Sequence, residues 1–324
     1  MLIARFVAGV SPFCAMVLGA GGAYGQDYPN RPVHIYTTAP GGGSDFSARI
    51  LSQTLPAILG QPVIVENRGG SVIIAAQAVA KAPADGYTLL LYGSTFWLLP
   101  FLQDSAPYDP LRDFLPVTLT NRAPNILVVH PSLPVKSVRD LIALARARPG
   151  ELNYSSGPSG SSNHLSAELL KAMAKVNIVR IPYKGTAPAL TALLGGEVQL
   201  MFGTASTVAP HLQSGRLKAL AVTGATSSSL APGLPPISAV LPGYESVAQS
   251  GIFAPAGTPA AIISRLNREI VQVLRRADIR EKFFSSGTEA IGSTPGELAD
   301  AMKTEMAVMG KVIKDAGIRD SGAP

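Results

Sequence analysis

The sequence predicts an α/β protein made of two lobes. Its 324 residues are 47% hydrophobic and 15% charged, which is enough chain for two domains of about 100 to 200 residues each. Strand-like and helix-like segments alternate from Val33 onward, and the alternation begins again after residue 120. Such alternation with short connections predicts parallel strands with helices on both faces of each sheet.

The first lobe is expected to begin with a strand at 33–37, which is rich in residues that favour β-structure. A glycine-rich loop at 38–45 follows it, and then a helix with one apolar side that ends at Gly60. The next expected elements are a strand at 61–65, a helix at 73–82 and a strand at 88–92. Because ligands bind beyond the carboxyl ends of parallel strands, the loops at 41–44 and 93–95 are candidate binding segments.

The glycine-rich loop has the features of an anion site. Residues 41–43 are glycines, which let the backbone turn sharply and leave its N–H groups open to a ligand. The N-terminus of the following helix carries a partial positive charge. A glycine-rich turn can also serve packing alone, so a second loop of this kind is needed to decide. Asp45 either caps its helix, which is the interpretation we favour, or contacts an amino group of the ligand.

That second loop lies at residues 153–164, before an expected helix whose apolar residues begin at Leu165. It combines glycines with a series of serines and ends in Asn163 and His164. Hydroxyl groups and free amides can bind a carboxylate without a buried countercharge. The two loops together therefore predict a site for a small carboxylate, and His164 is the one histidine that we expect near the ligand.

Two strand-like segments, residues 115–120 and 217–223, are expected to cross between the lobes. They divide the chain into a first lobe of residues 26–121 and 224–324 and a second lobe of residues 122–223. Further expected elements are strands at 125–129, 179–182 and 199–202, a helix at 138–146 and an irregular Pro/Gly/Ser-rich segment at 224–251. Helices at 258–277, 278–286 and 294–316, the last opened by a capping box from Thr294 to Glu297, are expected to cover the first lobe.

The first 25 residues differ from the rest of the chain. Arg5 is their only charged residue, a mostly apolar segment follows it, and small residues precede Gln26. This pattern predicts a secretory signal peptide cleaved near Gly25, with a retained membrane anchor as the alternative. The only cysteine, Cys14, lies inside this segment. We therefore expect an exported, periplasmic protein without a disulfide or a cysteine-bound metal.

Other classes of function lack their sequence signals. The formal net charge is +6, but the basic residues are scattered and aromatic residues make up only 6% of the chain, so no nucleic-acid partner is expected. The four histidines are far apart in the sequence, and no metal-binding spacing, nucleophile elbow or nucleotide-phosphate motif is found. We expect no metal, no cofactor and no enzymatic activity. A hydrolase or lyase assembled from distant residues is the alternative.

Nine segments, spread in order over essentially the whole mature chain, carry a family resemblance. They are Tyr28-Pro29-x-Arg31-Pro32, Pro40-Gly41-Gly42-x-x-Asp45-x-x-Ala48-Arg49, Leu59-Gly60-Gln61-Pro62-Val63, Glu66-Asn67-Arg68, Asp85-Gly86-Tyr87-Thr88-Leu89-Leu90, Tyr108-Asp109-Pro110, Asp113-Phe114, Pro182-Tyr183-Lys184-Gly185 and Ala254-Pro255-Ala256-Gly257-Thr258-Pro259. The chain thereby resembles the tripartite tricarboxylate transporter substrate-binding receptors, the Bug or TctC family.

The resemblance implies a type II-like periplasmic binding protein whose two lobes, joined by two crossing strands, close on a small carboxylate. We expect a monomer that delivers this ligand to a two-subunit membrane permease; a receptor that reports to a membrane sensor is the alternative. In this family, loops matching residues 40–45 and 155–164 hold the carboxylate, and loops matching 94–95 and 203–206 line the rest of the cleft. The ligand-binding residues expected on this basis are Gly41, Gly42, Ser44, Asp45, Ser94, Thr95, Ser161, Asn163, His164, Tyr183, Thr204 and Ala205. Tyr183 and Lys184 are equally consistent with a surface that faces the permease or solvent.

Two departures from the family pattern bear on this cleft. After Glu66-Asn67-Arg68 the family usually has Pro-Gly-Ala, whereas residues 69–73 here are shorter and bulkier. Any ligand contact from this loop is therefore left open. The family also usually has Trp two residues before Gly251, where this chain has Gln249. From the sequence, this second change predicts no particular effect on the ligand.

Overall fold

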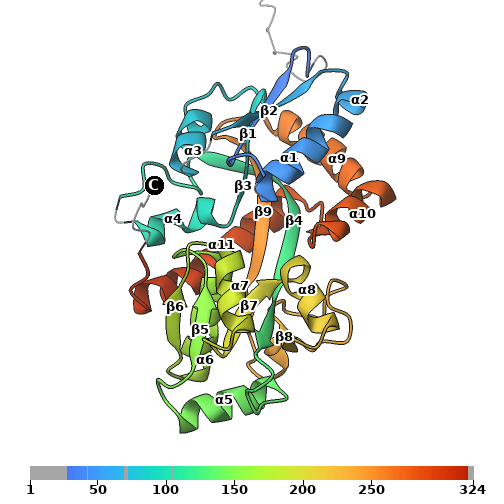
Figure 1. Ribbon diagram of the computed structural model, residues 1–324. Coiled ribbons are helices and arrows are strands. Elements are labelled where there is room, and N and C mark those ends of the chain that lie inside the picture. The colour runs from blue at the N-terminus through green and yellow to red at the C-terminus, as the bar shows by residue number, and fades with distance from the viewer. Residues whose placement is uncertain (1–27, 42, 69–71, 104, 320–324) are drawn as a thin grey trace, which may run out of the picture.

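The computed structural model describes residues 28–41, 43–68, 72–103 and 105–319, which form two lobes joined by two long strands (Figure 1). The expected α/β class and two-lobe architecture are thus confirmed. The expectations about the first 25 residues, Gly42 and residues 69–71 lie outside this part of the chain. Within it, every helix is too short or too polar to cross a membrane.

The upper lobe in Figure 1 contains three parallel strands with β1 in the middle. They are β1 (Val33–Thr37), β2 (Val63–Asn67) and β3 (Thr88–Gly93). Leu89, Leu90 and Leu91 of β3 are all buried, because helices and neighbouring segments cover both faces of the sheet. The carboxyl ends of β1 and β3 therefore lie at the same edge of this sheet.

Four helices follow these strands: α1 (Gly43–Thr54), α2 (Pro56–Leu59), α3 (Val72–Ala80) and α4 (Thr95–Leu102). The single helix expected up to Gly60 is divided, because Pro56 lacks a backbone N–H and begins α2 instead. Gly60 ends α2 with φ of 70°, in the left-handed region that glycine reaches without strain. The N-termini of α1 and α4 consequently lie next to the carboxyl ends of β1 and β3.

The connection between the lobes is made by β4 (Phe114–Val129) and β9 (Val247–Pro255), which pair antiparallel. The two strands expected at 115–120 and 125–129 are one continuous strand. The expectation of irregular structure up to residue 251 is wrong for β9, because pairing with β3 on one side and β4 on the other overrides a weak local preference. Residues 217–223, expected to cross between lobes, instead supply β8, and β9 makes the return crossing.

The lower lobe is built around the second half of β4, which pairs antiparallel with β7 (Leu200–Thr204) and β8 (Lys218–Val222). The sheet continues from β7 through β5 (Asn153–Ser156) to β6 (Val179–Pro182), all parallel. Its helices are α5 (Val138–Ala147), α6 (Ser162–Ala174), α7 (Thr186–Leu194) and α8 (Ala205–Gln213). The hydroxyl of Ser137 caps α5 by accepting the N–H of Asp140. As in the upper lobe, α6 begins close to the carboxyl end of a parallel strand, β5.

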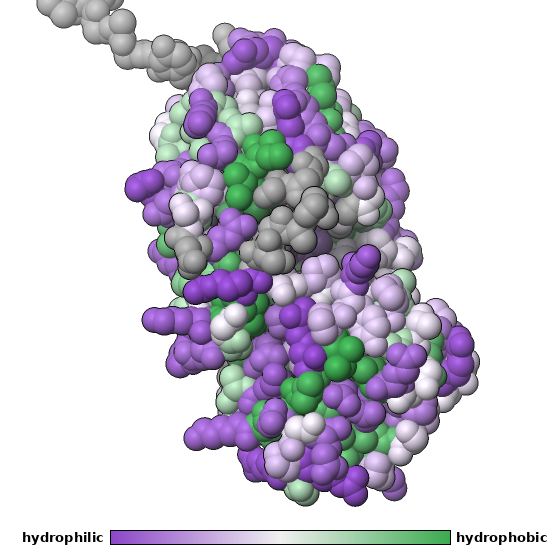
Figure 2. Space-filling view, turned by 60° about the vertical axis from the view of Figure 1, so that its left-hand side comes forward, coloured by the Kyte–Doolittle hydropathy of each residue, from purple (hydrophilic) through white to green (hydrophobic). Residues whose placement is uncertain are grey.

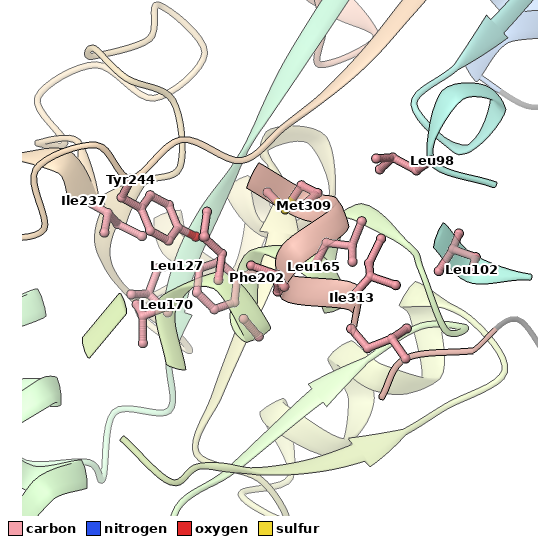
Figure 3. Packing of buried hydrophobic residues seen from close by; sticks show 14 of the residues in the cluster. Leu98, Leu102, Leu127, Leu165, Leu170, Phe202, Ile237, Tyr244, Met309 and Ile313 are labelled. Atoms are coloured by element: carbon pink, nitrogen blue, oxygen red, sulfur yellow. The ribbon is translucent and has the colours of Figure 1, made fainter. Parts of the chain in front are cut away.

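Residues 224–246 pack with the lower lobe. They include the short 3-10 helix η1 (Ile237–Ala239), and Ile237 and Tyr244 lie in one buried cluster with Leu170 and Phe202 (Figure 3). The hydroxyl of Tyr244 donates a hydrogen bond of 2.8 Å to the carbonyl of Ser166 in α6. We therefore propose a return to the first lobe near Val247 in place of the predicted boundary at residue 224.

The C-terminal part contains α9 (Ala260–Leu274), α10 (Ala277–Ser285), β10 (Glu289–Ala290) and α11 (Pro295–Asp315). Helices α9 and α10 cover the first lobe as expected, since Ile270 and Phe283 share a buried cluster with Ile35 of β1. Helix α11 does not follow that expectation. It packs against α4 of the upper lobe and α6 of the lower lobe, so it lies across the junction between them.

Candidate functional site

A cavity of about 540 Å³ is lined by segments from both lobes. Its wall is formed by the loop at 38–44, the starts of α4 and α6, the first part of β9 and one side of α11. The volume is within the range that small organic ligands occupy in proteins. The structure places four of the expected ligand residues in this wall: Gly41, Ser44, Ser94 and Thr95.

Three helices begin at this cavity. Gly43 and Ser44 of α1, Thr95 of α4 and Ser162 of α6 are the first residues of their helices, and all of them line the wall. The first turn of a helix has free backbone N–H groups and a partial positive charge. Among the described lining residues there is no lysine, arginine or histidine. The wall can therefore attract an anion through amides and dipoles instead of cationic side chains.

Asp45 stabilises the glycine-rich loop from behind. Its Oδ2 accepts hydrogen bonds of 2.9 Å from the N–H of Gly41 and from Arg49 Nε, and its Oδ1 accepts one of 2.7 Å from Asn67 Nδ2. Burial raises the pKa of Asp45, but the hydrogen bonds from Arg49, Asn67 and Gly41 outweigh burial and lower it overall. Asp45 is 2% exposed and lies outside the cavity wall. This placement indicates a structural role in the loop before α1, because the backbone N–H that Asp45 accepts belongs to Gly41; the cap of the helix itself, favoured from the sequence, stays a prediction.

Asn67 is a positioning residue that sequence reasoning did not assign to the site. Besides Asp45, its Nδ2 donates a hydrogen bond of 2.7 Å to the carbonyl of Thr38, and its Oδ1 accepts one of 3.1 Å from Arg49. It therefore ties the end of β2 to the loop that lines the cavity. The signal was available in the Glu66-Asn67-Arg68 segment, which belonged to the family resemblance.

In the second loop, the residues that line the cavity are not those predicted. Gly160, Ser162 and Leu165 face the cavity, whereas Asn163 and His164 are 6% and 2% exposed and lie outside its wall. The predicted residues instead stabilise the loop. Asn163 Oδ1 accepts the N–H of His164 at 2.8 Å and lies 2.6 Å from the hydroxyl oxygen of Ser161.

His164 is held in its neutral form. Its Nδ1 accepts a hydrogen bond of 3.2 Å from the N–H of Gly160. Burial, together with the nearby charges of Arg180 and Lys171, lowers the pKa of His164 from 6.5 to about 4, while Glu168 acts in the opposite direction. At neutral pH this side chain therefore contributes a hydrogen-bond acceptor to the loop and no positive charge to the ligand.

The remaining predicted residues lie elsewhere in the lower lobe, outside the cavity wall. Thr204 is the residue before α8, and its Oγ1 lies 2.7 Å from Thr207 Oγ1. Ala205 is buried in the core of the lower lobe, and Tyr183 packs at the edge of that core. All three residues lie in the lower lobe, and none of them lines the cavity with the glycine-rich loop.

Two parts of the cavity wall were not predicted from the sequence. The first is residues 246–250, which are the residue before β9 and the first four residues of that strand. The second is Glu305 with Met309 on α11. The hydroxyl oxygen of Ser250 lies 3.5 Å from that of Ser44, so β9 faces the start of α1 directly. Both segments were missed because their location depends on the crossing between lobes. The one sequence signal was the departure from the family pattern at Gln249.

Glu305 is the one acidic side chain in the described cavity wall. Its Oε2 accepts hydrogen bonds from Ser94 Oγ at 3.1 Å, Trp97 Nε1 at 3.0 Å and Gln249 Nε2 at 3.1 Å. Burial raises the pKa of Glu305 to about 7, although these donors lower it, and the nearby charge of Glu245 also raises it. The hydroxyl of Ser94, expected to bind the ligand, is thus used to bind Glu305.

Comparison with known proteins identifies the family. The sequence model of the tripartite tricarboxylate transporter family receptor, TctC, matches residues 47–318. The chain belongs to this family. Protein BugT of Bordetella pertussis is 36% identical over 326 residues, covering 98% of this chain and 99% of BugT. A protein encoded in the tcbD-tcbE intergenic region of Pseudomonas sp. strain P51 is 36% identical over 306 residues, covering 93% of this chain and 90% of its own.

Solved structures agree with the fold of this TctC-family receptor. R. palustris Rpa4515 with adipate has a TM-score of 0.73 and 38% identity, covering 90% of this chain and 99% of its own. MatC from Rhodopseudomonas palustris with bound malate has a TM-score of 0.69 and 30% identity, covering 88% and 100%. A TctC solute-binding protein from Polaromonas has a TM-score of 0.82 at 23% identity, covering 89% and 99%, which supports the fold. The expected family and receptor role are therefore confirmed.

Proposed function

We propose that the cavity between the lobes binds a small carboxylate whose oxygens lie against the starts of α1, α4 and α6. The observation that carries this proposal is the convergence of three helix N-termini on a wall whose described residues include no cationic side chain. Free N–H groups and helix dipoles favour an anion at such a place. The structures of Rpa4515 with adipate and of MatC with bound malate support the same class of ligand.

The protein acts as a receptor without chemistry of its own. His164, the histidine expected near the ligand, is buried, accepts a hydrogen bond from Gly160 and has a pKa lowered to about 4. It is therefore poorly suited to take up a proton at neutral pH. The described cavity wall otherwise consists of backbone, hydroxyl, apolar and amide groups and one carboxyl, which suits binding and release.

We place the mature protein, from Gln26 after cleavage near Gly25, in the periplasm as a monomer that delivers its ligand to a two-subunit permease. Membership in the receptor family supports the delivery role. Figure 2 shows hydrophilic and hydrophobic residues interspersed over one face of both lobes.

A thermal-shift screen of residues 26–324, refolded to remove bound ligand, tests the carboxylate proposal. Adipate, malate and other small acids would be compared with their neutral amides. A ligand at 100 times its Kd should stabilise the native state by about 2.7 kcal/mol, which is readily detected. Stabilisation by acids but not by amides is expected. Equal stabilisation by both, or none by any acid, would contradict the proposal.

Ser44→Ala tests where the carboxylate lies. Ser44 lines the cavity at the start of α1, so removal of its hydroxyl should weaken binding by about 0.5 to 1.5 kcal/mol. Ser52→Ala is the matched control, because the hydroxyl of Ser52 donates to the carbonyl of Arg49 on the outside of the same helix. Calorimetry should show a change for the first variant alone. Equal affinities for both variants would place the ligand elsewhere.

A further inference from the structure

We propose that Glu305 binds a hydrogen-bond donor on the ligand, so that this receptor prefers a carboxylate that also carries an ammonium group over a dicarboxylate. The inference rests on the proposed carboxylate site and adds the class of the second ligand group. Three features of Glu305 lead to it: its hydrogen bonds, its place in the cavity wall and the charges around it.

The hydrogen bonds of Glu305 use only one of its two oxygens. Ser94, Trp97 and Gln249 all donate to Oε2; Ser94 is the residue before α4, Trp97 lies in α4 and Gln249 lies in β9. Over the described part of the chain, Oε1 has no hydrogen-bond partner. An ionised carboxylate has about four acceptor positions. The three protein donors therefore fix the carboxyl group and leave Oε1 able to accept from a ligand.

The charge of the cavity wall favours a cation next to Glu305. The described wall has no other ionisable side chain, so no lysine or arginine there neutralises this carboxyl. A second carboxylate of a ligand would meet Glu305 as a like charge, which disfavours ionisation of both groups. An ammonium group would instead form an ion pair in a partly buried setting, where attraction is stronger than in bulk water. The carboxylate at the helix N-termini and the ammonium at Glu305 would then each face an opposite charge.

The groups around Glu305 strengthen this preference. Glu305 also lines a second cavity of about 380 Å³, which shares the residues that begin β9 with the first cavity and is also lined by Glu245, Asp300 and Arg122. Arg122 Nε lies 3.6 Å from Glu289 Oε2, so its charge is already partnered. The remaining charged side chains of this second cavity are acidic. Of these side chains, Glu245 is the one whose charge raises the pKa of Glu305, whereas Asp300 is not among the groups that shift it.

Matched ligand pairs test the inference on the mature protein, residues 26–324. Adipate would be compared with 6-aminohexanoate, glutarate with 5-aminopentanoate and succinate with 4-aminobutyrate by isothermal titration calorimetry near neutral pH. Each pair shares one carboxylate and the chain length. The amine should bind about tenfold or more tightly than its dicarboxylate in the pair that fits best. Tighter binding of the dicarboxylate throughout would overturn the inference and leave the carboxylate site standing. Absence of binding by all six acids and by malate would overturn both.

Glu305→Gln identifies the residue responsible. Glutamine keeps the size and an acceptor but removes the charge, so the preference for the amine should fall about tenfold. Asp300→Asn is the matched control, because Asp300 lies on the same helix and lines the second cavity but not the first. The control should leave the ratio of the two affinities unchanged. The same ratio in Glu305→Gln as in the wild type would contradict the inference.

Proton exchange provides a measurement on the wild type alone. Because burial holds Glu305 partly protonated near neutral pH, a bound ammonium group should ionise it and release protons. A dicarboxylate should instead cause proton uptake. Calorimetry of the same ligand in two buffers with different ionisation enthalpies measures this exchange. Proton uptake on binding of the amine would overturn the inference even if the variants fail to fold.

Discussion

Asp45, which is buried, and Glu305, which is half-buried, illustrate how the neighbours of a carboxyl group set its charge. Each accepts hydrogen bonds from three donors. One donor to Asp45 is the guanidinium of Arg49, and the pKa of Asp45 is lowered even though burial opposes this. The donors to Glu305 are neutral, and burial raises its pKa to about 7. The first carboxylate, in the first turn of α1, holds the loop before that helix, whereas the second is expected to change its charge when a ligand enters the cavity.

Glu305→Gln should stabilise the ligand-free protein more at pH 8 than at pH 5. The pKa of Glu305 is raised from 4.5 to about 7 by burial, so folding opposes ionisation. The wild type therefore loses stability as pH rises from 4.5 through 7, by up to about 3 kcal/mol at about 1.4 kcal/mol per pKa unit. Urea unfolding at both pH values measures the difference. A variant whose effect is the same at both would show that Glu305 does not titrate in this range.

His164→Asn should make the protein less sensitive to acid. Burial is the largest cause that lowers the pKa of His164 from 6.5 to about 4. The wild type therefore loses stability as pH falls from 6.5 to 4, again by up to about 3 kcal/mol. Asparagine can still accept the N–H of Gly160 but does not titrate. The free energy of unfolding of the variant should fall less between pH 7 and pH 4.5, and a parallel decline in both proteins is the contrary result.

At the scale of elements, the start and end of α11 were predicted correctly, but its packing position was not. Its start follows from local chemistry: Thr294 Oγ1 accepts the N–H of Glu297, whose Oε2 accepts the N–H of Thr294 in return. This capping box is visible in the sequence because all its partners lie within four residues. The faces that α11 presents to α4 and α6 depend on tertiary packing. The local signal therefore located the helix but not Glu305 in the cavity.

Thr294→Ala tests the contribution of this cap. Loss of the hydroxyl removes the acceptor for the N–H of Glu297 and should destabilise the protein by about 0.5 to 2 kcal/mol. Thr304→Ala is a matched control on the exposed side of the same helix and should change stability by less than about 0.5 kcal/mol. Thermal unfolding of both variants measures the difference. Equal effects would mean that the cap adds nothing beyond a helical preference.

The same contrast explains how much of the site could be predicted. The two loops at the starts of α1 and α6 were found because glycines, serines and helix patterns are local features. The sequence did not predict which residues of the second loop face the cavity. Ser161, Asn163 and His164 form hydrogen bonds within their own loop, whereas Gly160 and Ser162 line the wall. The contribution of β9 was missed altogether, since pairing between distant strands fixes it.

At the scale of the whole molecule, a single hydrophobic cluster extends through both lobes. Met309 and Ile313 of α11 pack between Leu98 and Leu102 of the upper lobe and Leu165 of the lower lobe (Figure 3). The lobes are thus connected by a shared core as well as by β4 and β9. A rotation of one lobe on the other must therefore bend these strands and shift the packing of α11.

Ile313→Ala should reveal this shared core. Ile313 is fully buried, and its truncation should destabilise the protein by about 2 to 5 kcal/mol. Hydrogen exchange followed by mass spectrometry should show faster exchange in both α4 and α6, because each packs on the altered part of α11. Val308→Ala, at a side chain that is 39% exposed on the same helix, should leave exchange nearly unchanged. Faster exchange confined to one lobe would contradict a shared core.

The hydrogen bond from Trp97 to Glu305 has a practical consequence. Trp97 is the single tryptophan in the sequence, and its indole N–H lies 3.0 Å from a carboxylate oxygen in the cavity wall. Indole fluorescence depends on the electric field around the ring, so a change of charge at Glu305 alters the emission of the whole protein. The receptor thus carries an intrinsic optical reporter of its proposed binding site, and candidate ligands can be screened on the unlabelled, unmodified chain.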